Sequence, residues 1–219
     1  MVIQSKEGES MALFPLFINL EGRTGLVVGG GRTALEKIKR LLDYGVTLRV
    51  TAPETLPELD TLPGVELMRR PFAEEDLEDS LVFVVAATDC MKTDREIAEL
   101  CKARRIPVNV VDAPEYSTFL FPALVRRGPL TIGISTGGAS PSAAIHLKQE
   151  IDSFLPEHIG EIIDWLRQQR RLIKGQISSG AIRKKVFQRL FTESLNKKRP
   201  LTQEEIRVLV MAAEREVTE

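Results

Sequence analysis

An apolar run that ends in three glycines constrains this chain more than any other feature. Residues 24–31 read TGLVVGGG, and the segment that follows places Ala34, Ile38 and Leu41 on one helical face before Gly45. The apolar run predicts a buried strand, because strands of parallel sheets carry continuous apolar side chains. The spacing of three and four residues predicts an amphipathic helix that ends at the glycine. The sequence therefore predicts a strand, a glycine turn and a helix in direct succession.

The glycine turn also matches a binding fingerprint. Gly29, Gly31 and Ala34 follow the spacing G-x-G-x-x-G/A of dinucleotide-binding folds. The first glycine permits the tight turn, the second lets the backbone approach a pyrophosphate, and the small third residue lets the helix pack on the sheet. A flexible turn without a ligand is the alternative, but the flanking strand and helix favour the fingerprint. We expect NAD to be bound by Gly29, Gly30, Gly31, Arg32, Thr33 and Ala34.

Strand-like and helix-like segments alternate through the first half of the chain. Strand patterns cover residues 46–52, 65–70, 81–89 and 106–114, and a helical pattern covers residues 93–104. Such alternation predicts a parallel, doubly wound sheet.

The pattern changes after residue 113. Two strand-like runs, residues 117–125 and 128–136, have no room for a helix between them, so we expect a hairpin or an arm. A second copy of the chain would cover the apolar edges of such a hairpin. From Pro141 onward the pattern is helical. The expected fold is α/β, with an N-terminal Rossmann-like parallel sheet, a central dimerisation hairpin and a C-terminal helical domain. The expected parts are a disordered lead-in at 1–11, an NAD-binding domain at 12–113, a central dimerisation segment at 114–150 and a helical domain at 151–219.

Small and polar residues fall at the carboxyl ends of the predicted strands, where open parallel sheets bind ligands. Thr51 ends the second strand, and Ala87 and Thr88 end the fourth, so we expect these three residues to contact the cofactor. The acid that usually binds the ribose is missing at the end of the second strand, because Glu54 comes slightly late. No arginine stands there for a 2′-phosphate, which favours NAD over NADP. We expect Asp89 to cap the next helix, with a place at the cofactor as the alternative.

Asp112 ends the last apolar run of the predicted sheet, VNVV at residues 108–111. A carboxylate at the ligand edge of a sheet is a candidate general base. The alternative is an aspartate that starts the turn before Pro114, and the local sequence leaves both interpretations open.

The run of residues 135–141, STGGASP, precedes a predicted helix. It fits a second anion-binding loop, and it also fits a hinge in which Ser140 caps the helix and Pro141 begins it. His146 and His158, the only histidines, lie far apart, so we expect no metal site.

Charge and composition set the expected surroundings of the protein. The formal net charge is −1, yet residues 167–199 hold eleven Lys or Arg and one acid. Such a segment attracts anions, or it is simply a solvated helical face. The spacing of Cys90 and Cys101 fits neither a zinc site nor a redox pair, so we expect reduced thiols. With no apolar run of membrane length and no signal-peptide core, we expect a cytoplasmic protein that binds no membrane.

Four motifs together resemble the precorrin-2 dehydrogenase family, the dehydrogenase and ferrochelatase portion of siroheme synthases. They read FPLFINLEGRTGLVVGGG, AATD, VNVVDAP and FPALVRRGPLTIGISTGGASP, and the resemblance covers roughly residues 12–165. It implies NAD-dependent oxidation of precorrin-2 to sirohydrochlorin, followed in some members by insertion of ferrous iron. It also implies an intertwined homodimer. Because the resemblance stops where longer siroheme synthases continue into a methyltransferase, we expect that activity to be absent.

The resemblance also implies roles for single residues. Asp112 matches the key aspartate of the family, because VNVVDAP is intact. Lys37 matches a basic position of the first helix, and Thr33 stands where the family usually has a branched apolar residue. The loop serine or threonine of the family matches Ser135 and Thr136. The expected substrate-binding residues are Lys37, Arg126, Ser135, Thr136 and Gly137.

A binding module is the rival interpretation. The basic C-terminal third would suit an NAD-responsive sensor that binds nucleic acid through its helices. The segment shows no aromatic interleaving and no recognition-helix motif, so we expect no nucleic-acid partner. Turnover of precorrin-2 with NAD separates the two hypotheses, and so does salt-dependent binding to DNA.

Overall fold

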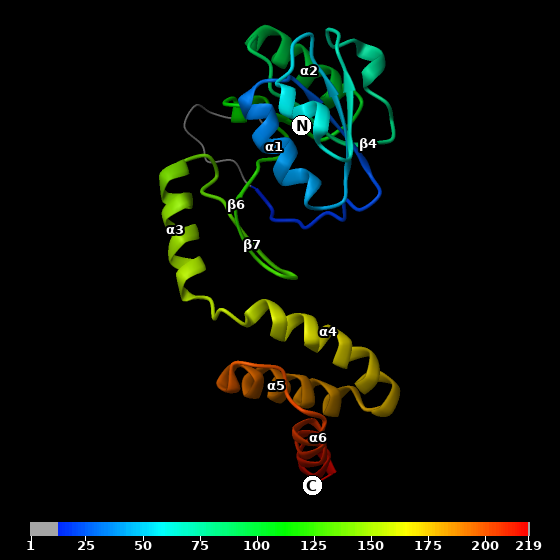
Figure 1. Cartoon of the computed structure of the whole chain (residues 1–219), viewed down its shortest axis with the longest axis vertical. Helices are drawn as coiled ribbons and strands as arrows, with labels where there is room; N and C mark the ends of the chain where they lie inside the picture. Colours follow the sequence, from blue (N-terminus) through cyan, green and yellow to red (C-terminus); the bar gives the residue numbers. More distant parts are fainter. Residues whose placement is uncertain (1–12, 219) are drawn as a thin grey trace, which may run out of the picture. The chain divides into compact units, whose positions relative to one another are not determined.

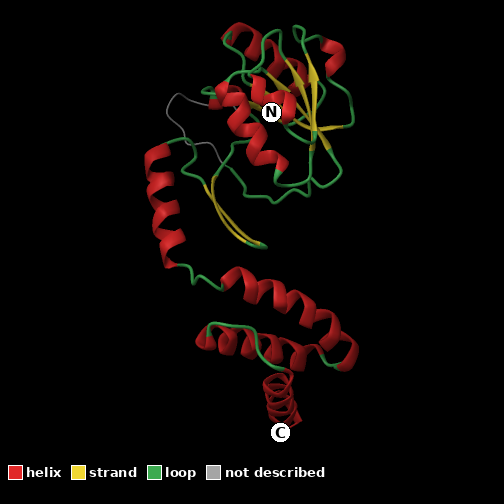
Figure 2. Ribbon diagram, viewed as in Figure 1, coloured by secondary structure: helices red, strands yellow, loops and turns green. Residues whose placement is uncertain are grey.

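The computed structural model describes residues 13–218, so the expected lead-in at 1–11 lies outside the described residues. The chain divides into two compact units, Met1–Phe121 and Pro122–Glu219, which Figures 1 and 2 both draw. The finer boundaries at residues 113 and 150 stay predictions.

The first unit is built on a five-stranded parallel sheet with the order β3-β2-β1-β4-β5. Its strands are β1 (Thr24–Val28), β2 (Thr47–Thr51), β3 (Val65–Met68), β4 (Leu81–Ala86) and β5 (Val108–Val110). Its helices are α1 (Arg32–Leu42) and α2 (Met91–Ala103), with short 3-10 turns η1 (Pro57–Thr61), η2 (Glu74–Asp76) and η3 (Pro114–Tyr116). The strand order reverses between β1 and β4, which is where doubly wound sheets bind their ligands.

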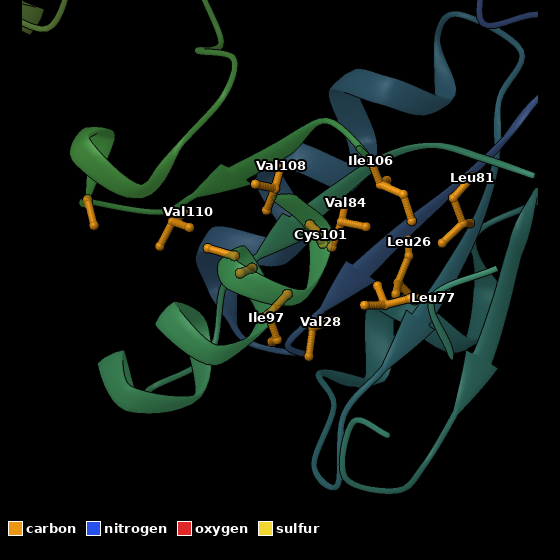
Figure 3. Close-up of a cluster of buried hydrophobic side chains, with 13 residues drawn as sticks. Leu26, Val28, Leu77, Leu81, Val84, Ile97, Cys101, Ile106, Val108 and Val110 are labelled. Atoms are coloured by element: carbon orange, nitrogen blue, oxygen red, sulfur yellow. The ribbon is translucent and has the colours of Figure 1, made fainter. Parts of the chain in front are cut away.

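The two helices cover opposite faces of the sheet, because side chains alternate along each strand. Leu26 and Val28 pack with Ile97 and Cys101 of α2, as Figure 3 shows. Val27, between them in β1, packs with Ala34, Leu35, Ile38 and Leu41 of α1. The predicted parallel, doubly wound sheet is confirmed.

The edge strand β5 is closed by hydroxyl groups rather than by another strand. The backbone N–H of Val108 donates to Thr118 Oγ1 (2.8 Å), and that of Val110 donates to Ser117 Oγ (2.9 Å). These bonds satisfy donors that an edge strand would otherwise expose. Residues 117–122, expected as the start of a strand, belong to no strand, so that part of the prediction is wrong. Ser117 and Thr118 instead bond to β5 through their side chains.

The second unit begins with a two-stranded antiparallel hairpin of β6 (Ala123–Arg127) and β7 (Leu130–Ile134). Four helices follow it: α3 (Pro141–Phe154), α4 (Ile159–Gln176), α5 (Gly180–Lys197) and α6 (Gln203–Thr218). The last three share an apolar core of Ile173, Ile177, Val186, Leu190, Leu201, Ile206 and Ala213. The hairpin and the C-terminal helices confirm the predicted fold class.

Candidate active site

The carboxyl ends of four strands meet at one edge of the sheet. Backbone hydrogen bonds extend the pairing past the strands, from Gly29 to Thr51 (2.9 Å), from Ala87 to Val28 (2.8 Å) and from Val111 to Ala86 (2.9 Å). The glycine turn, the end of β2, the Ala87–Thr88 turn and the approach to Asp112 therefore belong to one edge, as the sequence predicts.

The three glycines of the turn have different surroundings. Gly29 has φ +125°, and an added Cβ would lie 2.1 Å from the carbonyl oxygen of Ala87. An added Cβ on Gly30 would lie 2.3 Å from the carbonyl oxygen of Glu54. Around Gly31, in contrast, nothing lies within 4 Å of the Cβ position, and the residue is exposed. Protein backbone thus requires the first two glycines, whereas the third faces open space.

The start of α1 has no side-chain cap and no acid in its first turn, and Gly31 is its N-cap. Helix N-termini carry unpaired N–H groups and the positive end of the helix dipole. Arg32 and Thr33 are exposed there, while Ala34 is fully buried against the sheet. The buried Ala34 lets α1 pack close to the sheet, and the cofactor-binding roles of Arg32 and Thr33 stay predictions.

The connection after β2 turns back over the glycine turn. The backbone N–H of Leu56 donates to the carbonyl of Gly30 (3.0 Å), which brings the exposed Glu54 beside the turn despite its late position in the sequence. Thr51 itself is fully buried, and its Oγ1 has no hydrogen-bond partner among the described residues. The hydroxyl of Thr51 therefore lies under the site, and the exposed carboxylate at this end of β2 belongs to Glu54.

The turn after β4 is held by Thr88 and by a residue that the sequence reasoning missed. Thr88 donates its backbone N–H (3.2 Å) and its hydroxyl (2.7 Å) to Asp94 Oδ1. The N-cap of α2 is Cys90, whose backbone N–H donates to Thr88 Oγ1 (3.2 Å). The prediction that Asp89 caps this helix is wrong, because Asp89 precedes the cap position and points to solvent. Asp94 could have been found as the one acid on the apolar face of the predicted helix.

Asp112 follows β5 in a left-handed conformation, with φ +57°, and is exposed. Aspartate adopts this conformation more readily than most residues, and such outliers are concentrated at functional sites. The half-buried Lys37 lies within electrostatic range of it, and Lys37 Nζ sits 4.6 Å from the centroid of the Phe121 ring. Burial and the charge of Arg40 lower the pKa of Lys37, while the charge of Asp112 acts in the opposite direction. The structure thus brings together the predicted base and one predicted substrate-binding residue.

The other predicted substrate-binding residues lie in the second unit. Arg126 is exposed on β6. Thr136 Oγ1 donates to the carbonyl of Ser140 (3.0 Å) and accepts from its N–H (3.1 Å), and Ser135 Oγ accepts from the N–H of Gly137 (3.2 Å). Ser140 caps α3 by accepting from Ala143 N, which confirms the predicted cap. The loop is thus a tied turn at the start of a helix.

Residues 13–218 contain neither a candidate metal cluster nor a candidate membrane span. No group of three or more His, Cys, Asp or Glu side chains is placed to hold a metal ion within this range. Of the helices in the same range, none has both the length and the apolar character that a membrane span requires.

Family models match most of this arrangement. Residues 16–123 match a family described as NAD(P)-binding, and residues 127–153 match the central part of sirohaem biosynthesis proteins. The first range contains the whole sheet edge, and the second contains the loop and α3 except for Phe154.

Curated relatives are siroheme synthases. The protein of Thioalkalivibrio sulfidiphilus is 38% identical over 183 residues, which is 82% of this chain and 37% of the relative. That of Pseudomonas fluorescens is 40% identical over 75% of this chain and 36% of the relative, and that of Escherichia coli is 36% identical over 81% and 39%. The chain therefore spans well under half the length of these relatives.

A solved structure matches most of the chain. The precorrin-2 dehydrogenase SirC superposes with a TM-score of 0.66 at 27% identity, covering 93% of this chain and all of that one.

Proposed function

Because the chain belongs to the precorrin-2 dehydrogenase family, which includes the matching portion of siroheme synthases, we propose that it oxidises precorrin-2 to sirohydrochlorin with NAD. The observation that carries the proposal is the open space at Gly31, at an uncapped helix start, on the same sheet edge as Asp112. A cofactor phosphate fits the open space at the uncapped start of α1. A substrate that must lose a proton fits beside the carboxylate of Asp112.

The cofactor would be held by the first turn of α1. The N–H groups after Gly31 would donate to the pyrophosphate, and Arg32 would add a positive charge. Ala87 and Thr88 would border the other half of the cofactor. When bound, the nicotinamide supplies the hydride acceptor, and the protein supplies position and proton transfer.

Glu54 supports NAD as the preferred cofactor. Its place beside Gly30 suits the carboxylate that accepts hydrogen bonds from ribose hydroxyls and repels a 2′-phosphate. The exposed Arg32, directly after the glycines, is the cation at this turn that would instead attract a 2′-phosphate. Glu54→Gln should therefore bring the dissociation constants for NAD and NADP closer together.

Asp112 would act as the general base. Oxidation removes a hydride and a proton from the macrocycle, and an exposed carboxylate at the ligand edge can accept that proton. Lys37 would bind a substrate carboxylate next to it, and Arg126, Ser135, Thr136 and Gly137 are the proposed contacts from the second unit. In a member that also inserts ferrous iron as a substrate, the same carboxylate would accept the pyrrole protons.

The hairpin would form a homodimer. Both strands of β6-β7 pair only with each other among the described residues, so each keeps an open edge. A second copy can cover such edges through a two-fold contact. Cys90 and Cys101 are free thiols, which suits the reducing cytoplasm as the place of action.

Calorimetry with NAD tests the cofactor site. Gly31→Asp places a carboxylate where the pyrophosphate would lie, and like charges at about 4 Å cost roughly 4 kcal/mol near a protein surface. We expect a folded variant whose affinity for NAD falls by at least about a hundredfold. Gly31→Ala is the matched control, because it adds bulk without charge and should lose less. Unchanged NAD affinity in folded Gly31→Asp would reject the assignment.

A further inference from the structure

Asp94 is a buried carboxylate in an apolar environment. It is 3% exposed and lies on the face of α2 that also carries Ile97 and Cys101, both labelled in Figure 3. Burial raises the pKa of this carboxyl, although its hydrogen bonds with Thr88 act in the opposite direction. A carboxylate costs free energy to bury unless hydrogen bonds compensate, so its partners identify its role.

Both hydrogen bonds to the Asp94 side chain, among the described residues, come from Thr88. The backbone N–H and the hydroxyl of Thr88 converge on one carboxylate oxygen, Oδ1, at 3.2 and 2.7 Å. The two residues are six positions apart, one in the turn after β4 and one inside α2. Asp94 therefore fastens the turn to the rigid helix.

The fastened turn abuts the glycine turn. The carbonyl oxygen of Ala87, one residue before Thr88, lies 2.1 Å from where a Cβ of Gly29 would be, and Ala87 N donates to Val28 O. No side-chain atom separates the two backbones at this point. A shift of the Thr88 turn would therefore displace the glycine turn, where the cofactor is proposed to bind.

We propose that Asp94 is a positioning residue that holds the Ala87–Thr88 turn in the shape that accepts the dinucleotide. This inference rests on the proposed binding of NAD at this edge. Asp94 is too deeply buried to touch the cofactor, so it acts through Thr88. Removing its acceptor leaves the turn mobile, and bound cofactor then has to order it.

Asp94→Ala and Asp94→Asn separate positioning from charge. The alanine variant loses the acceptor, so the dissociation constant for NAD should rise about tenfold, with KM for NAD rising more than kcat falls. The asparagine variant keeps an Oδ1 that can accept both bonds, so it should restore most of the affinity, to within about threefold. Glu96→Ala, an exposed acid of the same helix, is the control for lost charge and should bind NAD normally.

A second measurement keeps the proposal falsifiable if Asp94→Ala folds poorly. Thr88→Val removes the hydroxyl from the other side, and Thr88→Ser restores it, so the first should weaken NAD binding and the second should recover it. Amide exchange at Thr88 should be faster in Asp94→Ala even without NAD. A tight NAD complex in folded Asp94→Ala or Thr88→Val would overturn the positioning role alone. If the wild-type protein does not bind NAD, the proposed function and this role are both overturned, even where amide exchange at Thr88 is faster in Asp94→Ala.

Discussion

At the scale of single residues, Asp112 is the exposed carboxylate that follows β5 in a left-handed conformation. The place of Asp112 at the end of an apolar run could be predicted, because strands of a parallel sheet end at one edge. Its left-handed backbone could not, since it depends on how residues 113–121 return along β5. By its position in the sequence, Glu54 comes too late to be the ribose-binding acid at the end of β2. The chain after β2 turns back to Gly30, which brings Glu54 to that end.

The first prediction concerns the proton acceptor. Asp112→Asn keeps a side chain that tolerates the left-handed conformation and removes its basicity. We expect a folded variant that binds NAD normally and loses a factor of about 10²–10⁴ in kcat, the usual contribution of a general base. Steady-state kinetics with calorimetry measures both. Turnover near that of the wild type would make Asp112 a turn residue.

At the scale of elements, the local sequence pattern predicts an element correctly where the segment determines its own structure. The glycine turn with α1 and the Ser140 cap follow from local signals. Pattern failed where a neighbouring element intervenes. Residues 117–122 look like a strand, but Ser117 and Thr118 side chains take the hydrogen bonds of β5. The Asp89 cap failed because Thr88 and Asp94 already hold that turn.

The second prediction concerns the connection between β3 and β4. Burial alone would raise the pKa of Asp76, but Arg70 and the backbone N–H of Ala73 hold it below its usual range. A lowered folded pKa means that the stabilisation is present above the unfolded value, about 3.9, and is lost as the pH falls through the folded value. Asp76→Asn should therefore have a lower melting temperature than the wild type at pH 7. The difference should shrink on acidification, and a constant difference across that range would contradict the account.

At the scale of the whole molecule, the basic C-terminal third carries less unpaired positive charge than its composition suggests. Lys185 and Arg189 pair with Glu216, and Lys197 and Arg199 pair with Glu205. Sequence counting missed this, because the acids lie beyond the basic segment, in α6. Arg167 pairs with Asp164 as well, so five of the eleven cations are partly neutralised within their own unit.

The third prediction concerns assembly. The open edges of β6-β7 should be covered by a second copy, so light scattering at micromolar concentration should report twice the mass of the chain. The mass should not change with salt, because apolar side chains and backbone hydrogen bonds would stabilise the dimer rather than surface charges. A stable monomer would contradict the dimerisation role of the hairpin.

The most direct test of the central claim is an anaerobic incubation of the protein with precorrin-2 and NAD, followed by absorbance. The account predicts NADH and sirohydrochlorin in equal amounts from the wild type, and little of either from Gly31→Asp. Ferrous iron added afterwards tests chelation in the same vessel. A folded, NAD-binding wild-type protein that leaves precorrin-2 unoxidised would contradict the account.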